Sequence, residues 1–252
     1  MCYNETMAER VNIEDYIKLY NEGLKLTQIK PLKNQTYKIF RKSGLDIRIV
    51  KRDKTYGNAS AFQKIKHFTV DNEYFYMIPV TTVKETIVGF ILRGVTRSDY
   101  STVSREFSEN GKRVPLMFGF NKKFESFDNH DTCPPIVICE GSKDCIFLKQ
   151  FYPYTVAINT SSMGLNAQVL INLSNKFVLA YDNDKAGQDG IARDKRTLRS
   201  LGAQVTSLEL DQSKDEYGNF LIKDCSDYME YPDKVKSLRE ELYYKIRRVN
   251  SF

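Results

Sequence analysis

Two aspartates, Asp182 and Asp184, come just after a short apolar run at residues 176–180. A run of this length and composition predicts a fully buried strand. Carboxylates at positions i and i+2 past a strand end can face one point, and ligands of open α/β sheets bind at that carboxyl edge. Their hard oxygens suit Mg²⁺, which often bridges to substrate phosphates. The pair therefore indicates a cation site for phosphate chemistry; a polar turn with Asp184 near a helix cap is the alternative.

A third carboxylate, Glu140, ends a second apolar run at residues 134–139. Gly141 allows the backbone to turn there, and Ser142 is a candidate cap for the helix that follows. Gly187 is expected to relieve the turn that leads from the two aspartates into their own helix. Because predicted strands alternate with predicted helices, we expect a parallel sheet with right-handed crossovers. The predicted order is strand 136–139, helix 143–151, strand 155–158, helix 165–174, strand 177–181, helix 188–201 and strand 204–210.

These acidic stretches resemble the motifs of the TOPRIM domain, which DnaG-type primases, topoisomerases and some nucleases share. Residues 140–144 (Glu-Gly-Ser-Lys-Asp) resemble its E-G-x-x-D element, and residues 181–187 (Tyr-Asp-Asn-Asp-Lys-Ala-Gly) resemble its Y-D-x-D-x-A-G element. Residues 223–227 (Lys-Asp-Cys-Ser-Asp) resemble a primase turn near which acidic residues complete the metal cluster. For Asp227, an ordinary cap of a short helix is the alternative.

The resemblance implies a role for each acid. Three of them would be catalytic as well as metal-binding, and Glu140 would either ligate the metal or take a proton. Residues behind the ligands would orient a ligand or its water. The implied catalytic residues are Glu140, Asp182 and Asp184, the implied metal ligands are these three and Asp224, and the implied supporting residues are Asp144 and Asp227.

The resemblance extends over residues 37–228 to the RNA polymerase domain of DnaG-type primases. Residues 73–79 and 86–94 are predicted to form two antiparallel strands, and they are similar to a primase segment in which a basic residue, here Arg93, helps line the template groove. An arginine that simply extends to water is the alternative. Residues 98–113 are polar and charged, so we expect a mobile connection there. The interchangeable candidates for nucleic-acid contact in it are Arg105, Lys112 and Arg113.

The net charge of +6 lies in the first half of the chain. Residues 1–133 hold 22 Lys and Arg against 16 Asp and Glu, whereas residues 134–252 hold 16 of each. A basic lobe beside an acidic metal crevice suits a polyanionic substrate; a solvated basic face is the alternative. This part is also predicted to hold helices at residues 12–26 and 35–41. The basic residues expected to contact backbone phosphates are Arg41, Lys42, Arg48, Lys51 and Arg52.

The composition bounds the compartment and the cofactor. A hydrophobic content of 41% with 12% aromatic residues is typical of a folded protein. No apolar run reaches the ~18–20 residues of a membrane span, and the N-terminus lacks the apolar core of a signal peptide. We expect a cytoplasmic protein, in the host cytoplasm if phage-encoded. Five cysteines without a C-x-x-C pair and only two histidines do not match a structural zinc site, so we expect no zinc. The acidic residues and the resemblance imply Mg²⁺ or Mn²⁺ instead.

We therefore expect an α/β fold with a TOPRIM parallel sheet flanked by helices at residues 134–210. A basic α+β subdomain at residues 1–133 precedes it, and an acidic turn with a helical tail at residues 211–252 follows. The resemblance implies a primase, which joins ribonucleoside triphosphates into short RNA primers on single-stranded DNA by metal-assisted nucleotidyl transfer. A separate template-recognition or helicase protein is a possible partner, and no membrane is expected. The alternatives are a TOPRIM nuclease and a non-catalytic subunit that binds single-stranded nucleic acid.

Overall fold

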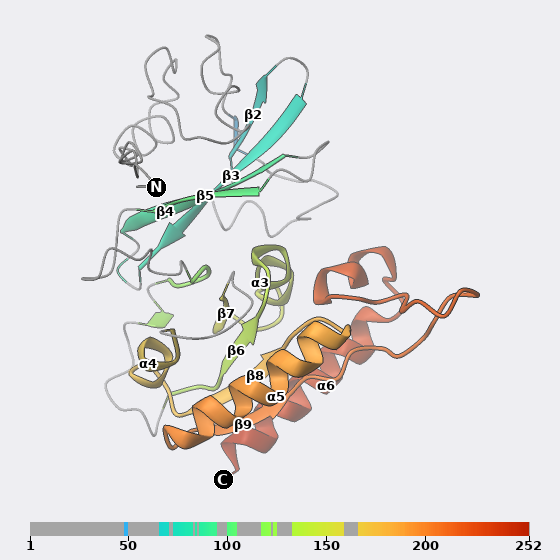
Figure 1. Cartoon of the computed structure of the whole chain (residues 1–252). Helices are drawn as coiled ribbons and strands as arrows, with labels where there is room; N and C mark the ends of the chain where they lie inside the picture. The colour runs from blue at the N-terminus through green and yellow to red at the C-terminus, as the bar shows by residue number, and fades with distance from the viewer. Residues whose placement is uncertain are drawn as a thin grey trace, which may run out of the picture. The chain divides into compact units, whose positions relative to one another are not determined.

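The computed structural model of the chain (Figure 1) describes residues 48–49, 66–70, 73–82, 84, 86–94, 100–104, 117–121, 123–124, 133–158 and 166–251. These residues form two compact units. The first contains the described residues from 48 to 80 and from 87 to 104, and the second contains those between 81 and 86 and all from 117 onward. The helices predicted at residues 12–26 and 35–41 lie outside the described residues.

A five-stranded sheet forms the first unit, in the order β1-β2-β3-β4-β5. Its β1–β2, β2–β3 and β4–β5 pairs are antiparallel. The two strands predicted around residues 73–79 and 86–94 are confirmed as the neighbours β3 and β4, and the side chains of Ile78, Val80 and Phe90 are buried. The strands are β1 (Arg48–Ile49), β2 (Lys66–Val70), β3 (Glu73–Thr81), β4 (Ile87–Gly94) and β5 (Tyr100–Ser104).

Residues 100–104, part of the segment 98–113 that was expected to be a mobile connection, form β5, so the expectation was wrong for these residues. β5 pairs with β4 from Gly89↔Ser104 to Arg93↔Tyr100. Its sequence, Tyr-Ser-Thr-Val-Ser, has the aromatic and β-branched residues that favour strands. The edge of β4 supplies the backbone hydrogen-bond partners of β5, and this contact is invisible in the local pattern of polar residues.

A four-stranded parallel sheet forms the centre of the second unit, in the order β7-β6-β8-β9. The parallel sheet and its strand–helix alternation are confirmed. β6 and β8 are the central strands and are almost wholly buried, which explains their uninterrupted apolar sequences. The strands are β6 (Ile136–Cys139), β7 (Thr155–Ala157), β8 (Lys176–Ala180) and β9 (Gln204–Ser207).

Helices cover both faces of this sheet. The helices are α3 (Ser142–Leu148), α4 (Asn166–Ile171), α5 (Lys185–Ser200), the 3₁₀ helix η3 (Cys225–Glu230) and α6 (Val235–Asn250). Because β7 and β9 are at opposite edges, right-handed crossovers place α3 and α5 on opposite faces. α4 contacts α5, and η3 contacts α3. α6 packs along β8 and β9 (Figure 1), and its Tyr243 hydroxyl donates to the carbonyl of Phe151 just past α3 (2.9 Å).

The helix starts differ from the predicted ones because backbone capping decides them. α5 begins at Lys185 rather than at residue 188, since the Asp184 side chain accepts the N–H of Gly187 (2.8 Å) and caps the helix. Gly187 therefore lies inside the first turn of α5 instead of before it. Ser142, the candidate cap of α3, is its first helical residue; Gly141 occupies the cap position and makes no side-chain cap bond.

The core of the second unit is a cluster of apolar side chains from β6, β7, β8 and the inward faces of α4 and α5. Cys139 and Cys145 are fully buried in this unit and act as small apolar residues. The segment before β6 is tied to β7 through the Phe118↔Ala157 bridge. Gly119 there has φ +108°, and a Cβ atom on it would lie 2.7 Å from the Cys145 sulfur. No helix in the described part of the chain is long and apolar enough to cross a membrane.

Candidate functional site

The ends of the two central strands bring the first two acidic stretches together. Glu140 follows β6 and Asp182 follows β8, and these strands are paired from Ile136↔Phe177 to Cys139↔Ala180. The backbone N–H of Asp182 donates to Glu140 Oε1 (3.3 Å). Two residues that are 42 positions apart in sequence thus share one edge of the sheet, as the strand pattern predicts.

Asp184 lies at the start of α5 and is exposed. One carboxylate oxygen accepts the N–H of Gly187 (2.8 Å), so the cap alternative for this residue is confirmed. The positive end of the helix dipole favours a carboxylate at this place. Capping uses one of its two oxygens and holds the side chain beside the strand ends, and metal binding by Asp184 remains a prediction.

Gly187 allows the close approach between α5 and the aspartate loop. A Cβ atom on it would lie 2.8 Å from the carbonyl carbon of Asp182 and closer still to the carbonyl oxygen. Real Cβ atoms do not approach backbone so closely, so the loop would have to move. The glycine that ends the Asp-x-Asp-x-x-Gly pattern therefore fixes how near the helix comes to Asp182.

The third acidic stretch, at Asp224 and Asp227, forms a capping box on η3. Asp224 Oδ1 accepts the N–H of Asp227 (2.9 Å), and Asp227 Oδ2 accepts the N–H groups of Asp224 (3.2 Å) and Lys223 (2.8 Å). The hydroxyl of Ser226 also donates to Asp224 Oδ1 (2.6 Å). Asp227 is therefore engaged in the cap of a short helix, although Asp224 and not Asp227 occupies the N-cap position itself.

Asp144 ties this turn to the rest of the site. Its side chain, on α3, is only 6% exposed, and its Oδ1 accepts the backbone N–H of Ser226 (2.9 Å). The bond joins residues that are 82 positions apart and fixes η3 against α3. This arrangement agrees with a supporting role for Asp144, since it positions the turn that carries Asp224.

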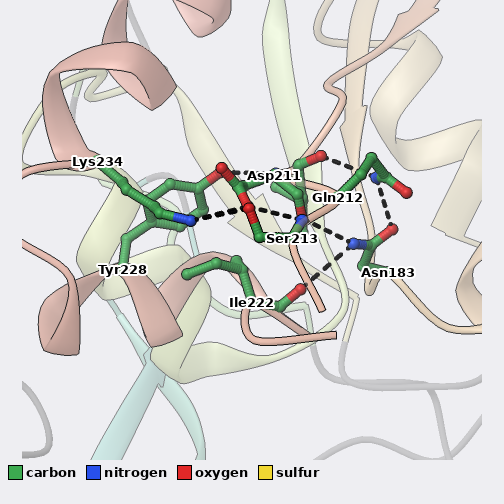
Figure 2. A network of polar contacts seen from close by, with 8 residues as sticks. Asn183, Asp211, Gln212, Ser213, Ile222, Tyr228 and Lys234 are labelled. Atoms are coloured by element: carbon green, nitrogen blue, oxygen red, sulfur yellow. Dashed lines mark hydrogen bonds and ion pairs between the residues drawn. The ribbon is translucent and has the colours of Figure 1, made fainter. Parts of the chain in front are cut away.

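Asn183, between the two aspartates, is a site residue that the sequence reasoning missed. Its backbone N–H donates to Lys223 O (2.6 Å), and its buried side-chain amide donates to Asp211 O (3.1 Å) and Ile222 O (3.3 Å). Figure 2 shows the amide between these carbonyls, with the Gln212 amide donating to its oxygen (3.0 Å). Asn183 thus clamps both ends of the 211–223 segment and holds Asp224 near Asp182. Nothing in the local sequence signals these contacts.

The clamp has a second layer, also visible in Figure 2. Lys234 Nζ donates to Asp211 Oδ1 (3.0 Å) and to Ser213 Oγ (3.1 Å), and the Tyr228 hydroxyl accepts the N–H of Asp211 (2.9 Å). These bonds connect the start of the segment to η3 and to the residue before α6. The segment is therefore held along its length by side chains rather than by strand pairing alone.

We expect Asn183→Ala to lower the free energy of unfolding by about 2–4 kcal/mol, because two buried carbonyls and one amide lose partners. The substitution should also lower the activity of the site, since Asp224 would no longer be fixed. Chemical denaturation measures the first effect. Asn172→Ala, which removes an exposed amide just past the end of α4, is the matched control and should change stability by less than about 0.5 kcal/mol. Equal stability of the two variants would contradict the clamp.

Burial and the neighbouring carboxylates raise the pKa values of the acidic residues in the site. Burial, and then the charges of Glu140, Asp224 and Asp184, together raise the pKa of Asp182 to about 7. Burial also raises the pKa of Glu140, and the hydrogen bond from the Asp182 N–H partly offsets this by lowering it. The pKa of the Asp144 carboxyl is raised by burial and then by Asp224. Such a cluster favours a bound proton or a bound cation.

These shifts predict a pH dependence of stability in EDTA. The folded pKa of Asp182, about 7, lies above the unfolded value near 4. The folded state therefore holds the proton more tightly, and this contribution is full below about pH 4 and is lost as the pH rises to about 7. Melting temperatures in EDTA should fall over this interval, and less steeply in Asp182→Asn. An identical fall in both proteins would contradict the assignment.

Tyr181, the first residue of the second motif, anchors the loop from behind. Its hydroxyl donates to Asp194 Oδ2 (2.8 Å) on α5, and Arg193 pairs with the same carboxylate (3.1 Å). Burial raises the pKa of the Tyr181 hydroxyl, so it stays a neutral donor. Its ring packs against Gly190, where a Cβ atom would lie 3.2 Å away. These contacts fix the direction in which Asp182 leaves β8.

The donor set fits a hard divalent cation in chemistry, although the side chains stand slightly apart. Across the described residues, no three His, Cys, Asp or Glu side chains are close enough together to hold a metal ion as they stand. Asp184 and Asp224 each spend an oxygen on a helix cap. Carboxylate oxygens are ligands that suit Mg²⁺ or Mn²⁺ better than a softer metal, so the chemistry of the donor set fits such a cation.

The basic residues predicted to contact nucleic acid are largely beyond what the structure describes. Arg93 is the partner of Tyr100 at the end of β4, and Arg48 is in β1, both by their backbone only. Their side chains lie outside the description. The other candidates, Arg41, Lys42, Lys51, Arg52, Arg105, Lys112 and Arg113, lie outside the described residues altogether.

Known proteins share this fold and part of this sequence. Residues 137–217 match the family model described as Toprim-like. A DNA primase of Clostridium acetobutylicum is 28% identical over 141 residues, which make up 55% of this chain and 23% of that primase. The chain thus spans less than a quarter of the length of this curated relative.

Solved structures give the same result for the fold. The primase fragment of the bacteriophage T7 primase-helicase protein matches 79% of this chain and 74% of its own, with a TM-score of 0.56 at 14% identity. A DnaG primase catalytic domain bound to single-stranded DNA matches over 71% and 55% of the two chains, with a TM-score of 0.50 at 19% identity. This chain therefore contains a Toprim-like domain at residues 137–217 and has the fold of primase catalytic cores, as its acidic motifs imply.

Proposed function

We propose that this chain is a primase that joins ribonucleotides into short RNA primers on single-stranded DNA by metal-assisted nucleotidyl transfer. One observation carries the proposal: carboxylates from three separate stretches, at Glu140, Asp182 and Asp224, lie near one another around the carboxyl edge of a parallel sheet. The Toprim-like match covers the first two stretches. The primase relative and the fold of primase cores favour primer synthesis over other phosphodiester chemistry.

In this proposal Glu140, Asp182, Asp184 and Asp224 hold Mg²⁺ or Mn²⁺. When bound, the cation would lower the pKa of the attacking 3′-hydroxyl and neutralise charge on the nucleotide phosphates. Alternatively, Glu140, whose pKa burial raises, takes a proton instead of holding the cation. Asp144 contributes by positioning the turn that carries Asp224.

The proposed substrates are a single-stranded DNA template and ribonucleoside triphosphates. The carboxylates alone repel phosphate, so approach of a nucleotide requires both the cation and positive charge nearby. The basic residues of the first 133 positions, Arg93 among them, are proposed to supply that charge. Two similar structures, one from a primase-helicase protein and one bound to single-stranded DNA, support a helicase or template-recognition partner and this class of template.

The test is an incubation of the purified chain with labelled ribonucleotides, unlabelled single-stranded DNA and Mg²⁺ or Mn²⁺, with the products separated on a gel. Short labelled RNA that disappears in EDTA supports the proposal. A parallel reaction with end-labelled DNA reports cleavage. Shortened DNA without RNA products would contradict the proposal and identify a nuclease. A mobility shift of the DNA without either product would identify a non-catalytic binding subunit.

A further inference from the structure

A groove of about 420 Å³ runs along β9, the outer strand of the parallel sheet, between α5 and α6. It is lined by four cationic side chains, by apolar side chains of β9 and α6, and by one carboxylate. We call it the β9 groove. Its cationic residues are Lys195 and Arg199 of α5 and Lys245 and Arg248 of α6.

The floor of the β9 groove is the outer edge of β9. The N–H groups of Gln204 and Leu208 donate inward to Asn175 O and Leu179 O of the β8 side (both 2.8 Å). Because N–H and C=O directions alternate in pairs along a strand, the peptide groups of Val205 and Ser207 face the groove. An outward edge of this kind is a template for one further strand.

Two cationic side chains from the walls of the β9 groove hydrogen-bond to residues of β9. Arg199 donates to the outward carbonyl of Val205 (3.2 Å), and Lys195 donates to the hydroxyl of Ser207 (2.8 Å). Both cations therefore lie directly over the outer edge of β9. A segment laid along that edge would pass within reach of them.

Positive charge is in excess in the β9 groove. Lys245 is 6% exposed and bridges Glu209 (2.9 Å) and Glu241 (3.1 Å), so only two carboxylates face four cations. The pKa of Lys195 is lowered by burial and then by the charges of Arg199 and Lys245, a direct sign of this repulsion. The groove is therefore complementary to a ligand with several negative charges.

We propose that the β9 groove binds an extended acidic peptide segment of a protein partner, which adds to the outer edge of β9. A peptide backbone supplies both the donors and the acceptors that match the outward peptide groups of Val205 and Ser207, whereas a phosphate backbone supplies acceptors alone. Acidic side chains of the segment match the cations of both walls.

The β9 groove is separate from the acidic cluster. Its cations stand on the C-terminal halves of α5 and α6, whereas the acids follow the carboxyl ends of β6 and β8. Peptide binding there is thus independent of the proposed primer synthesis. Substitutions in the groove should leave synthesis on a bare template unchanged.

The experiment measures binding of a fluorescein-labelled peptide of alternating glutamate and valine to the full chain by anisotropy. The test variant is Arg199→Glu/Arg248→Glu. The matched control is Arg196→Glu/Arg239→Glu, which makes the same change of charge at exposed residues of the same helices outside the groove. We expect the test variant to bind at least about tenfold more weakly and the control to stay within about twofold of the unmodified chain.

Two further arms decide the chemistry of the ligand. A peptide with alternate amides N-methylated should bind about tenfold more weakly, because it cannot pair with β9. Three outcomes would each overturn the proposal. They are equal weakening in the test and control variants, unchanged binding of the methylated peptide, and no saturable binding of the parent peptide. Loss of single-stranded oligonucleotide binding in the test variant, without peptide binding by the unmodified chain, would assign the groove to nucleic acid instead. Circular dichroism checks that each variant is folded.

Discussion

Asp182→Asn is expected to reduce primer synthesis by at least about a thousandfold. Asp182 lies between Glu140 and the stretches at Asp184 and Asp224, and all of these raise its pKa. Removing its charge takes away a ligand of the cation that is proposed to stabilise developing negative charge. That contribution amounts to several kcal/mol, and each ~1.4 kcal/mol in the barrier is about tenfold in rate. Single-turnover synthesis with labelled ribonucleotides measures it.

The fold should survive this substitution. Asp182 is half-buried and asparagine has nearly the same shape, and loss of a repelled charge should raise the melting temperature in EDTA at about pH 8. Asp189→Asn, the same chemical change at an exposed position of α5, is the control and should keep full activity. If Asp182→Asn synthesises primers in a metal-dependent way at a rate near that of the control, Asp182 is not a catalytic residue.

Gly187→Ala gives the second large effect, and its sign is diagnostic. In an open helix position the change from glycine to alanine would stabilise the chain by about 1 kcal/mol. Here the added methyl group would overlap the carbonyl of Asp182 and displace either the loop or α5. We expect the free energy of unfolding to fall by about 1–3 kcal/mol. Activity should fall strongly as well, since Asp182 moves with the displaced backbone.

Urea denaturation and primer synthesis measure the two consequences of Gly187→Ala. Gln188→Ala changes the next, exposed residue of the same helix turn and should be close to neutral in both assays. A stabilised, fully active Gly187→Ala would show that the aspartate loop does not depend on the close approach of α5.

The sequence by itself determined the strands of the parallel sheet, their alternation with helices, and the acids at the strand ends. Uninterrupted apolar runs at β6 and β8 predict buried parallel strands, and a carboxylate directly after such a strand must lie at the sheet's carboxyl edge. The positions of Glu140 and Asp182 follow from this geometry alone. The acidic motifs added the Toprim-like domain and the primase fold.

Local sequence was less informative where polar residues have two possible partners. Asp184 and Asp224 were predicted as metal ligands, and both also cap helices. The same carboxylate chemistry suits an orphan backbone N–H and a cation, so residue type cannot decide between them. β5 was missed because its partner is the edge of β4 and its own sequence is rich in serine.

Only the tertiary structure decided what holds the third acidic stretch against the other two. Asp144 reaches the N–H of Ser226, 82 positions away, and the Asn183 amide reaches the carbonyls of Asp211 and Ile222. These bonds form because burial leaves each polar group no water, so each must find whichever partner the packed chain brings near. The folded path of the backbone decides which groups become partners. The periodicity of apolar residues reports only neighbours in sequence, so it cannot predict these contacts.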